Sequence, residues 1–275
     1  MRLLKEAGLD AIDVDLMPGG FLTGGKGWET LSDEEVMELI RPCKEAAQKN
    51  GIAISQAHGG LSWFQETTPE RQALQQRVLK LQIKLCDFLD CPRLILHPAY
   101  LPYDQQTTAE DAREVNLDLL TQLIPTLKQY PVTVCIENCF IRNQGKTLEC
   151  TCSSGDIIDY IDELNIRAGQ KCFAYCLDTG HALLVGANIG DLIRKIGHRL
   201  EALHMNDNDG VDDRHTLPFT GLVDWQRMAE ALRDVGYHDS LNFEVNLGPR
   251  QLYPETLRYL AAVGRMFEQI ILNDR

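Results

Sequence analysis

The stretch FAYCLDTGHALL, residues 173–184, decides the fold because it joins a strand pattern directly to a helix signal. Residues 173–179 are a run of mostly apolar and aromatic side chains with the length of a strand. Asp178 comes just before Thr179 and Gly180, a position from which a carboxylate can cap a following helix. The stretch therefore predicts a β-strand that is followed at once by an α-helix.

The same strand-then-helix unit recurs along the chain. One helical pattern begins after a cap at Ser32, has an acidic first turn and ends before Gly51. Regular alternation of this kind predicts a parallel sheet covered by helices, and a (β/α)8 barrel of about 250 residues is its commonest form. The other strand candidates are residues 11–16, 52–58, 93–99, 132–138, 201–207 and 241–246.

We expect this α/β barrel to be incomplete. A closed barrel of this type has about eight strands, whereas only about seven are recognisable here. The chain opens with MRLLKEAGLD, which reads as a first helix followed directly by the strand at residues 11–16. The first strand is therefore expected to be missing, so that one sheet edge is open or is filled by another segment or subunit.

Composition fits one domain over residues 1–275, with 44% hydrophobic and 24% charged residues and no shift along the chain. The net charge of −13 argues against nucleic acid and anionic membranes as partners, because these usually require a basic face. The nine cysteines are an odd number, and no stretch resembles a signal peptide or a membrane span. We therefore expect reduced thiols and a cytoplasmic location.

Nearly every predicted strand carries an acidic or imidazole side chain at its carboxyl end. In a barrel these ends converge on one face, where the connecting loops build the active site. Seven segments that each deliver such a residue to an equivalent position indicate a shared site rather than separate solvated loops. The residues are Asp15, His58, His97, Glu137, Asp178, His204 and Glu244.

Four motifs resemble those of the xylose-isomerase-like superfamily of sugar phosphate isomerases and epimerases, which also contains the endonuclease IV type of apurinic endonuclease. They are VCIEN, CLDTGHALL, LHMNDNDG…DDRHTLPFTGLVDW and NFEVN. The resemblance covers almost the whole chain and implies one divalent metal ion with His181 beside it, in contact with substrate. Phe219 and Thr220 depart from the family pattern, which usually has a glycine and a polar residue in a PGxG loop. The implied metal ligands are Glu137, Asp178, His204 and Glu244.

Three carboxylates and one imidazole form a mostly oxygen-donor site, which favours Mn²⁺, Mg²⁺ or Co²⁺ and also accommodates Zn²⁺. A metal ion there would stabilise an enediolate as a proton leaves the carbon next to a sugar carbonyl. Glu137 and Glu244 are the candidate catalytic bases, since they come from different strands. Two opposed bases give epimerisation, and one base that moves a proton gives isomerisation. The sequence therefore predicts a metal-dependent sugar or sugar-phosphate isomerase or epimerase.

The other polar residues of these motifs are expected to line the substrate pocket. Trp63, shortly after His58, could offer an apolar face to a sugar ring, although packing under a loop explains it equally well. The predicted substrate contacts are His58, His97, His181, Asp213, Arg214, His215 and Trp63.

Other functions stay open. A phosphodiesterase of the endonuclease IV kind would hold three Zn²⁺ ions, and the resemblance supplies all nine ligands for it. The acidic balance and the sparse Lys and Arg near the motifs weigh against it. A lyase or dehydratase on the same site, a non-catalytic barrel and a homo-oligomer also stay open. The nine ligands would be His58, His97, Glu137, Asp178, His181, His204, Asp213, His215 and Glu244.

Overall fold

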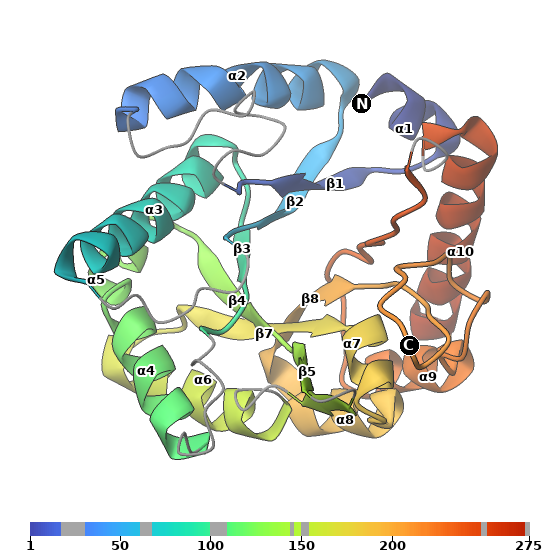
Figure 1. Cartoon of the computed structure of the whole chain (residues 1–275). Coiled ribbons are helices and arrows are strands. Elements are labelled where there is room, and N and C mark those ends of the chain that lie inside the picture. The colour runs from blue at the N-terminus through green and yellow to red at the C-terminus, as the bar shows by residue number, and fades with distance from the viewer. Residues whose placement is uncertain are drawn as a thin grey trace.

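Six parallel strands form a curved sheet that helices surround (Figure 1). The computed structural model describes residues 1–17, 31–60, 68–99, 109–143, 146–149, 154–248 and 252–272. Each strand pairs with its neighbours in chain order, so that the sheet follows the predicted strand–helix alternation. The strands are β1 (Ala11–Asp15), β2 (Ala53–His58), β3 (Arg93–Leu96), β4 (Thr133–Glu137), β7 (Phe173–Asp178) and β8 (Leu200–His204).

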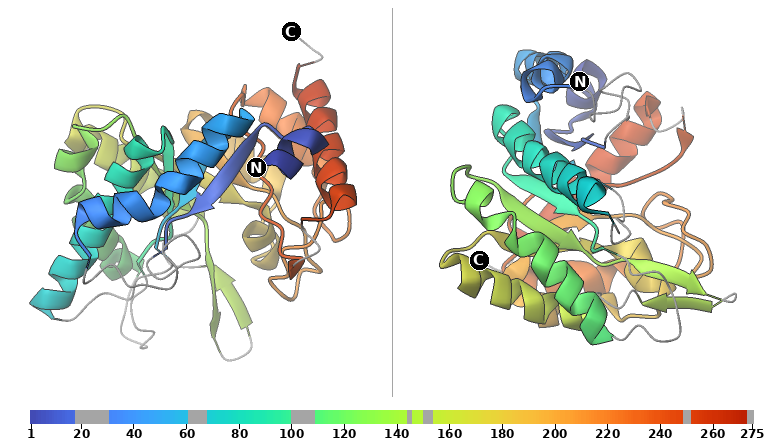
Figure 2. Two further views of the ribbon diagram at one scale, coloured as in Figure 1. Left: turned by 90° about the horizontal axis from the view of Figure 1, so that it is seen from above. Right: turned by 60° about the vertical axis from the view of Figure 1, so that its left-hand side comes forward.

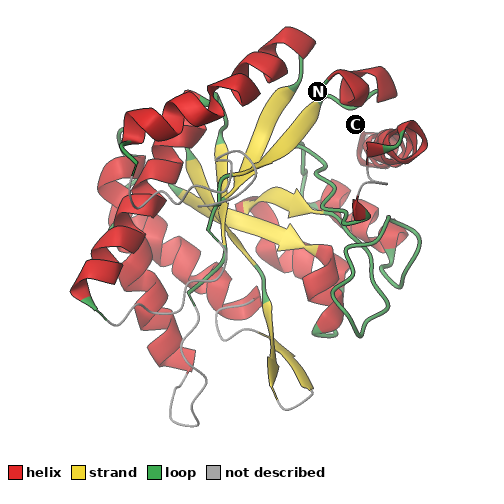
Figure 3. Ribbon diagram, turned by 45° about the horizontal axis from the view of Figure 1, so that its top comes forward, coloured by secondary structure: helices red, strands yellow, loops and turns green. Residues whose placement is uncertain are grey.

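The helices form the outer layer around these strands (Figures 1 and 3). They are α1 (Arg2–Ala7), α2 (Asp33–Asn50), α3 (Pro69–Phe88), α4 (Ala109–Thr121), α5 (Ile124–Leu127), α6 (Ser154–Ala168), α7 (Thr179–Leu184), α8 (Ile189–Ile196), a 3-10 turn (Gly197–Arg199), α9 (Trp225–Asp234) and α10 (Pro254–Leu272). In the described part of the chain, no helix is long and apolar enough to cross a membrane.

The expectation of an incomplete strand ring is confirmed. β1 pairs with β2, and no described strand pairs with its other edge. The predicted strand at residues 241–246 is reduced to one parallel bridge between Phe243 and Met205. The helix layer nevertheless closes, because α1 packs against α10 (Figure 1).

Local signals in the sequence set several element boundaries. Ser32 and Glu35 form a reciprocal capping box at the start of α2, as the cap and acidic first turn predict. Asp178 caps α7, because its side chain accepts a hydrogen bond from the backbone N–H of His181 at 2.6 Å. One element was not predicted. An antiparallel hairpin of β5 (Phe140–Asn143) and β6 (Lys146–Glu149) projects beyond the end of β4 (Figure 2).

The alternation of side chains along the strands separates the core from the site. Residues such as Val134 and Ile136 of β4 pack into the large cluster shared with the helices. Cys135 points to the opposite, inner face, where a small buried cluster fills the ring. Glu137 stands two residues after Cys135 and therefore shares that inner face. The inner cluster consists of Ile95, Cys135, Ala174, Cys176 and Ala202.

The long loop after β8 is organised by the buried carboxylate of Asp207. Its Oδ1 accepts hydrogen bonds from the backbone N–H groups of Asn208 and Val223, both at 3.0 Å. Its Oδ2 accepts one from Trp225 Nε1 at 2.8 Å. This one side chain therefore connects the end of the sheet to the start of α9.

We expect Asp207→Asn to lower the free energy of unfolding by about 1–3 kcal/mol, because an amide nitrogen would face a buried donor. Chemical denaturation measures this change. Asp209→Asn is the matched control, since Asp209 is exposed and an amide oxygen can still accept from Val211 N and Asp212 N. Equal stability of the two variants would contradict the role of Asp207.

Candidate metal and acid–base site

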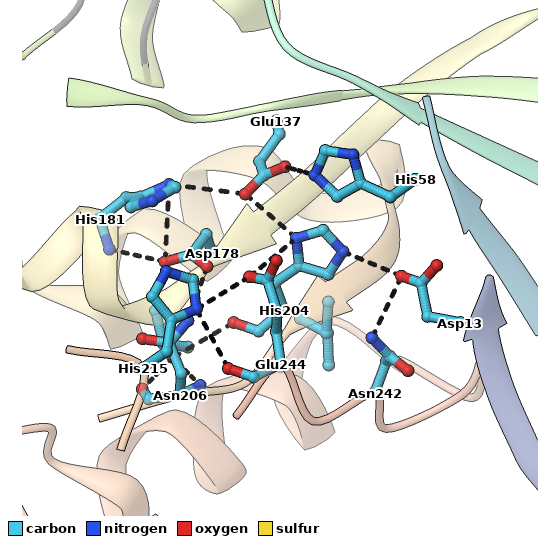
Figure 4. A network of polar contacts seen from close by, with 12 residues as sticks. Asp13, His58, Glu137, Asp178, His181, His204, Asn206, His215, Asn242 and Glu244 are labelled. Atoms are coloured by element: carbon cyan, nitrogen blue, oxygen red, sulfur yellow. Dashed lines mark hydrogen bonds and ion pairs between the residues drawn. The ribbon is translucent and has the colours of Figure 1, made fainter. Parts of the chain in front are cut away.

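The acidic and imidazole side chains predicted from the strand ends meet at one place (Figure 4). Glu137, Asp178 and His204 are the last residues of β4, β7 and β8, and all three are fully buried. They continue the inner face that carries Cys135, Cys176 and Ala202 two residues earlier. Glu244 joins them from the bridge segment, and His58 and His97 approach from the ends of β2 and β3.

Glu137, Asp178, His204 and Glu244 form the central group. One ligand atom from each residue lies within 4.8 Å of those from the other three. His204 Nδ1 is 3.1 Å from Glu137 Oε1 and 3.4 Å from Glu244 Oε2. The four donors therefore converge on a volume suited to a single ion.

This group fits a divalent cation. Among the described residues, both carboxylate oxygens of Glu137, Nδ1 of His204 and Oε2 of Glu244 are buried without a well-formed hydrogen bond. Such groups cost about 1–3 kcal/mol each when nothing satisfies them. Oxygen donors with one imidazole suit Mn²⁺, Mg²⁺ or Co²⁺ and also Zn²⁺.

The charges of the central group depend on one another. Burial acts to lower the pKa of His204, but Glu137 and Glu244 outweigh it and raise that pKa well above its ordinary value. Burial acts to raise the pKa of Glu137, but His204 and His97 hold it well below its ordinary range. Burial raises the pKa of Asp178 to about 7. Without a bound cation, protons on His204 and Asp178 therefore offset the negative charge of the buried carboxylates.

We expect a divalent cation to displace protons when it binds. Because the pKa of His204 is raised and that of Asp178 is about 7, both groups are protonated below neutral pH in the metal-free protein. Metal affinity should then rise between about pH 6 and 8, by about tenfold per pH unit for each proton displaced. Calorimetry in buffers of different ionisation enthalpy measures the released protons. An affinity independent of pH would contradict this expectation.

Two further groups flank the central one. His58 and His97 place Nε2 atoms at 3.4 and 3.0 Å from Glu137 Oε2. On the other side, Asp213 Oδ2 lies 3.6 Å from His181 Nε2 and 3.1 Å from His215 Nε2. All the predicted histidines and Asp213 are therefore brought together with the central group.

Backbone carbonyls contact the Nδ1 atoms of three of these histidines, among them His215 at 3.2 Å from the carbonyl oxygen of Glu244. His181 Nδ1 lies 2.9 Å from the carbonyl oxygen of Asn138, and His58 Nδ1 lies 3.0 Å from that of Gly59. A carbonyl oxygen only accepts, so each Nδ1 carries a proton and donates it. In the neutral rings, both Nε2 atoms are thus left to face Asp213 and Glu137, respectively, as acceptors or ligands.

Not every predicted residue reaches the site. Asp15 ends β1 as predicted, but its side chain is exposed, accepts a hydrogen bond from Met17 N and is in none of the possible metal-ligand groups among the described residues. Asp13, two residues earlier, contacts His204 instead. Arg214 pairs with acidic residues of its own loop, Asp209 among them, and its substrate contact stays a prediction. Trp63 lies outside the described residues.

Buried amides that the sequence reasoning missed hold the Asp178 carboxylate in place. Asn206 Nδ2 donates to Asp178 Oδ2 at 2.7 Å. Asn138 exchanges two hydrogen bonds with the Asp178 backbone, at 2.8 and 2.9 Å. Gly180 makes this arrangement possible, because a Cβ there would stand 2.0 Å from Asn206 Oδ1. In the sequence, the sign of these supporting contacts was the presence of asparagines directly after or near the acidic and imidazole residues at the strand ends.

We expect Gly180→Ala to weaken metal binding, since the added methyl group would displace Asn206 and release the Asp178 carboxylate. A fall of roughly 10–100-fold in affinity is typical when a partner of a metal ligand is lost. Gly264→Ala is the control, because its Cβ would meet nothing closer than 3.8 Å. If both variants bind metal as the unmodified chain does, the packing argument is wrong.

Phe219, which departs from the expected PGxG pattern, has an unusual backbone conformation. Its backbone φ is +67°, in the left-handed region that favours glycine. A side chain other than glycine holds this backbone conformation at a cost of roughly 1 kcal/mol. The Phe219 ring lies 5.7 Å from that of Trp225 and is 49% exposed. An aromatic side chain thus stands on the loop that carries Asp213 and His215.

Known proteins resemble this chain along most of its length. A family profile described as "Xylose isomerase-like TIM barrel" matches residues 1–263. Uncharacterized protein y4fM of Sinorhizobium fredii is 28% identical over 204 residues, which are 72% of this chain and 61% of that protein. D-psicose 3-epimerase of Enterocloster bolteae is 25% identical over 218 residues, 77% of this chain and 66% of that enzyme. The chain thus spans less than two thirds of the length of either relative.

Solved structures share the fold. A D-tagatose 3-epimerase-like protein superposes with a TM-score of 0.74 at 19% identity, over 98% of this chain and 92% of that one. The IOLI protein with a binding zinc atom superposes with a TM-score of 0.70 at 17% identity, over 98% and 91% of the two chains. At these identities the likeness establishes the architecture alone.

Proposed function

The chain belongs to the xylose isomerase-like TIM-barrel family, and from that premise we propose that it is a divalent-metal-dependent isomerase or epimerase of sugars. One observation carries the proposal. Three carboxylates and one imidazole converge within 4.8 Å at the carboxyl ends of parallel strands, and several of their atoms have no well-formed hydrogen bond among the described residues. The sugar epimerase among the relatives supports a small polyhydroxylated substrate.

Glu137, Asp178, His204 and Glu244 would hold one metal ion in this proposal. The ion, when bound, would polarise a sugar carbonyl and the hydroxyl group beside it. The chain's own residues would supply everything else: orientation of the sugar, exclusion of water and the movement of protons. Mn²⁺, Mg²⁺ and Co²⁺ are the favoured ions, with Zn²⁺ as a further candidate.

Glu137 and Glu244 would move the protons. They come from β4 and from the bridge segment beside β8, so they approach the central group from different directions. Glu137 Oε2 is 3.0 Å from His97 Nε2, which could donate a hydrogen bond that orients the carboxylate. Glu244 Oε2 is 3.4 Å from His215 Nδ1, which could do the same on the other side. Each base therefore has its own imidazole neighbour.

The remaining residues would bind the sugar. His181, Asp213 and His215 form a polar flank that could exchange hydrogen bonds with hydroxyl groups. His58 and His97 form the opposite flank. Arg214 and Trp63 stay proposed substrate contacts. An assay with the free and the phosphorylated sugar distinguishes the two possible substrates.

We expect Glu137→Gln and Glu244→Gln each to lower turnover of a ketohexose such as D-psicose by roughly 10²–10⁴-fold. Loss of carbon-bound hydrogen exchange with deuterated water should accompany the loss of turnover, because the same carboxylates move the proton. Proton NMR of the sugar measures the exchange, and testing the phosphorylated sugar in parallel defines the substrate.

Glu230→Gln on α9 is the matched control, since that carboxylate pairs only locally with Gln226. Circular dichroism and metal content show whether each variant is folded and loaded. Exchange that continues in both metal-loaded variants at the control's rate would rule out these two carboxylates as the bases.

A second candidate function is a three-zinc phosphodiesterase, and a specific observation favours it. Three of the five possible ligand groups among the described residues are His58 with His97 and Glu137, the central group, and His181 with Asp213 and His215. Together they provide the nine ligands that the endonuclease IV comparison requires. The net charge of −13 disfavours a polyanionic substrate.

Metal stoichiometry separates the two candidates. We expect elemental analysis of the protein purified without chelators to find one tightly bound divalent ion per chain. Three zinc ions per chain, together with cleavage of DNA at an abasic site, would replace the isomerase proposal with the phosphodiesterase.

A further inference from the structure

We propose that Asp13 of β1 is a positioning residue that holds the His204 ring with its Nδ1 toward the metal site. The proposal rests on the metal site described above, and it does not depend on which reaction that site catalyses. Asp13 stands two residues before the end of β1, outside the set of strand-end residues that the sequence singled out.

The geometry of His204 is two-sided (Figure 4). One ring nitrogen, Nδ1, faces the central group, at 3.1 Å from Glu137 Oε1 and 3.4 Å from Glu244 Oε2. The other, Nε2, faces away from it and lies 3.2 Å from Asp13 Oδ2. The ring is fully buried, so water does not compete for either nitrogen.

This contact selects one tautomer of His204. An ionised carboxylate only accepts hydrogen bonds, so Nε2 must carry the proton and donate it to Asp13. In the neutral ring Nδ1 then has a free lone pair, directed at the central group. A carboxylate behind a metal-binding histidine both fixes the ring orientation and makes the ligand more basic.

Asp13 is itself held in place. Its Oδ2 also accepts from Gln56 Nε2 of β2 at 2.9 Å and from Asn242 Nδ2 at 3.4 Å. Gln56 Nε2 is tied in turn to the carbonyl oxygen of Leu203 at 3.3 Å. Asp13 therefore receives donors from three directions, and its carboxylate has little freedom to turn away from His204.

The same contacts reach across the open side of the strand ring. β1 has no described strand on its outer edge, and Asp13 touches His204 of β8 and Asn242 of the bridge segment on the far side of that opening. The alignment of a metal ligand thus depends on a strand that is not its neighbour in the sheet. An Asp13 that only stabilised the fold would make the same contacts. The experiments must therefore distinguish stabilisation of the fold from orientation of His204.

Metal affinity of the metal-free protein, titrated with Zn²⁺ and with Co²⁺ by calorimetry, is the first readout. We expect Asp13→Ala to bind roughly 10–100-fold more weakly than the unmodified chain. Asp13→Asn should recover part of that loss, because an amide oxygen can still accept from His204. Asp15→Ala is the matched control on the same strand, since Asp15 is exposed and accepts a hydrogen bond from Met17 N.

The tautomer of His204 is the second readout, and a structural role alone would not change it. Long-range proton–nitrogen NMR of the zinc-loaded protein with ¹⁵N-labelled histidine should show His204 protonated at Nε2 and bound to metal through Nδ1. In Asp13→Ala this signal should broaden, or a second state should appear in which the ring has turned, so that Nε2 binds zinc and Nδ1 carries the proton. His204→Gln identifies the resonance among the seven histidines.

Three results would overturn the proposal. Asp13→Ala could bind metal as tightly as Asp15→Ala, the His204 tautomer could be the same with and without Asp13, or zinc could bind through Nε2 in the unmodified chain. If Asp13→Ala does not fold, Asp13→Asn carries both readouts. Failure of the unmodified chain to bind metal would overturn the site itself, whereas a lack of sugar turnover would leave these measurements unaffected.

Discussion

One buried carboxylate, that of Glu137, has an imidazole nitrogen of four different histidines within 3.5 Å. A lone carboxylate in a protein interior would be protonated, because burial penalises the charged form. Here the histidines hold the pKa of Glu137 well below its ordinary range. Glu137 in turn raises the pKa values of His58 and His204, which burial alone would lower. The other residues of the site surround this group of interacting charges.

The fold supplies that arrangement through the register of the parallel strands. Side chains two residues apart share a face, so the inner cluster of small residues at Cys135, Cys176 and Ala202 is followed directly by Glu137, Asp178 and His204. Small side chains fill the narrow interior, and the ligands emerge above them. The buried amide of Asn206 then donates to the Asp178 carboxylate, and that of Asn138 accepts from the Asp178 backbone N–H.

Because the strand ring is open, polar side chains make contacts that backbone hydrogen bonds between strands would make in a closed barrel. Between β1 and the bridge at Phe243, hydrogen bonds of Asp13 with His204 and Asn242 cross the opening. The loop after β8 depends in the same way on Asp207, which binds the backbone at both of its ends. Metal ligands are thereby supported by buried polar contacts from distant parts of the chain.

The sequence by itself determined the strand–helix order, the open edge of the strand ring and the convergence of Glu137, Asp178, His204 and Glu244, because strand ends in a parallel barrel share one face. Tertiary structure alone decided which aspartate of β1 turns inward. Asp13 and Asp15 are two residues apart and share one face of the strand, so alternation does not distinguish them, and the position of His204 along β1 selects Asp13. It also decided that the last strand shrinks to one bridge, since a strand's length depends on neighbours that local sequence does not encode.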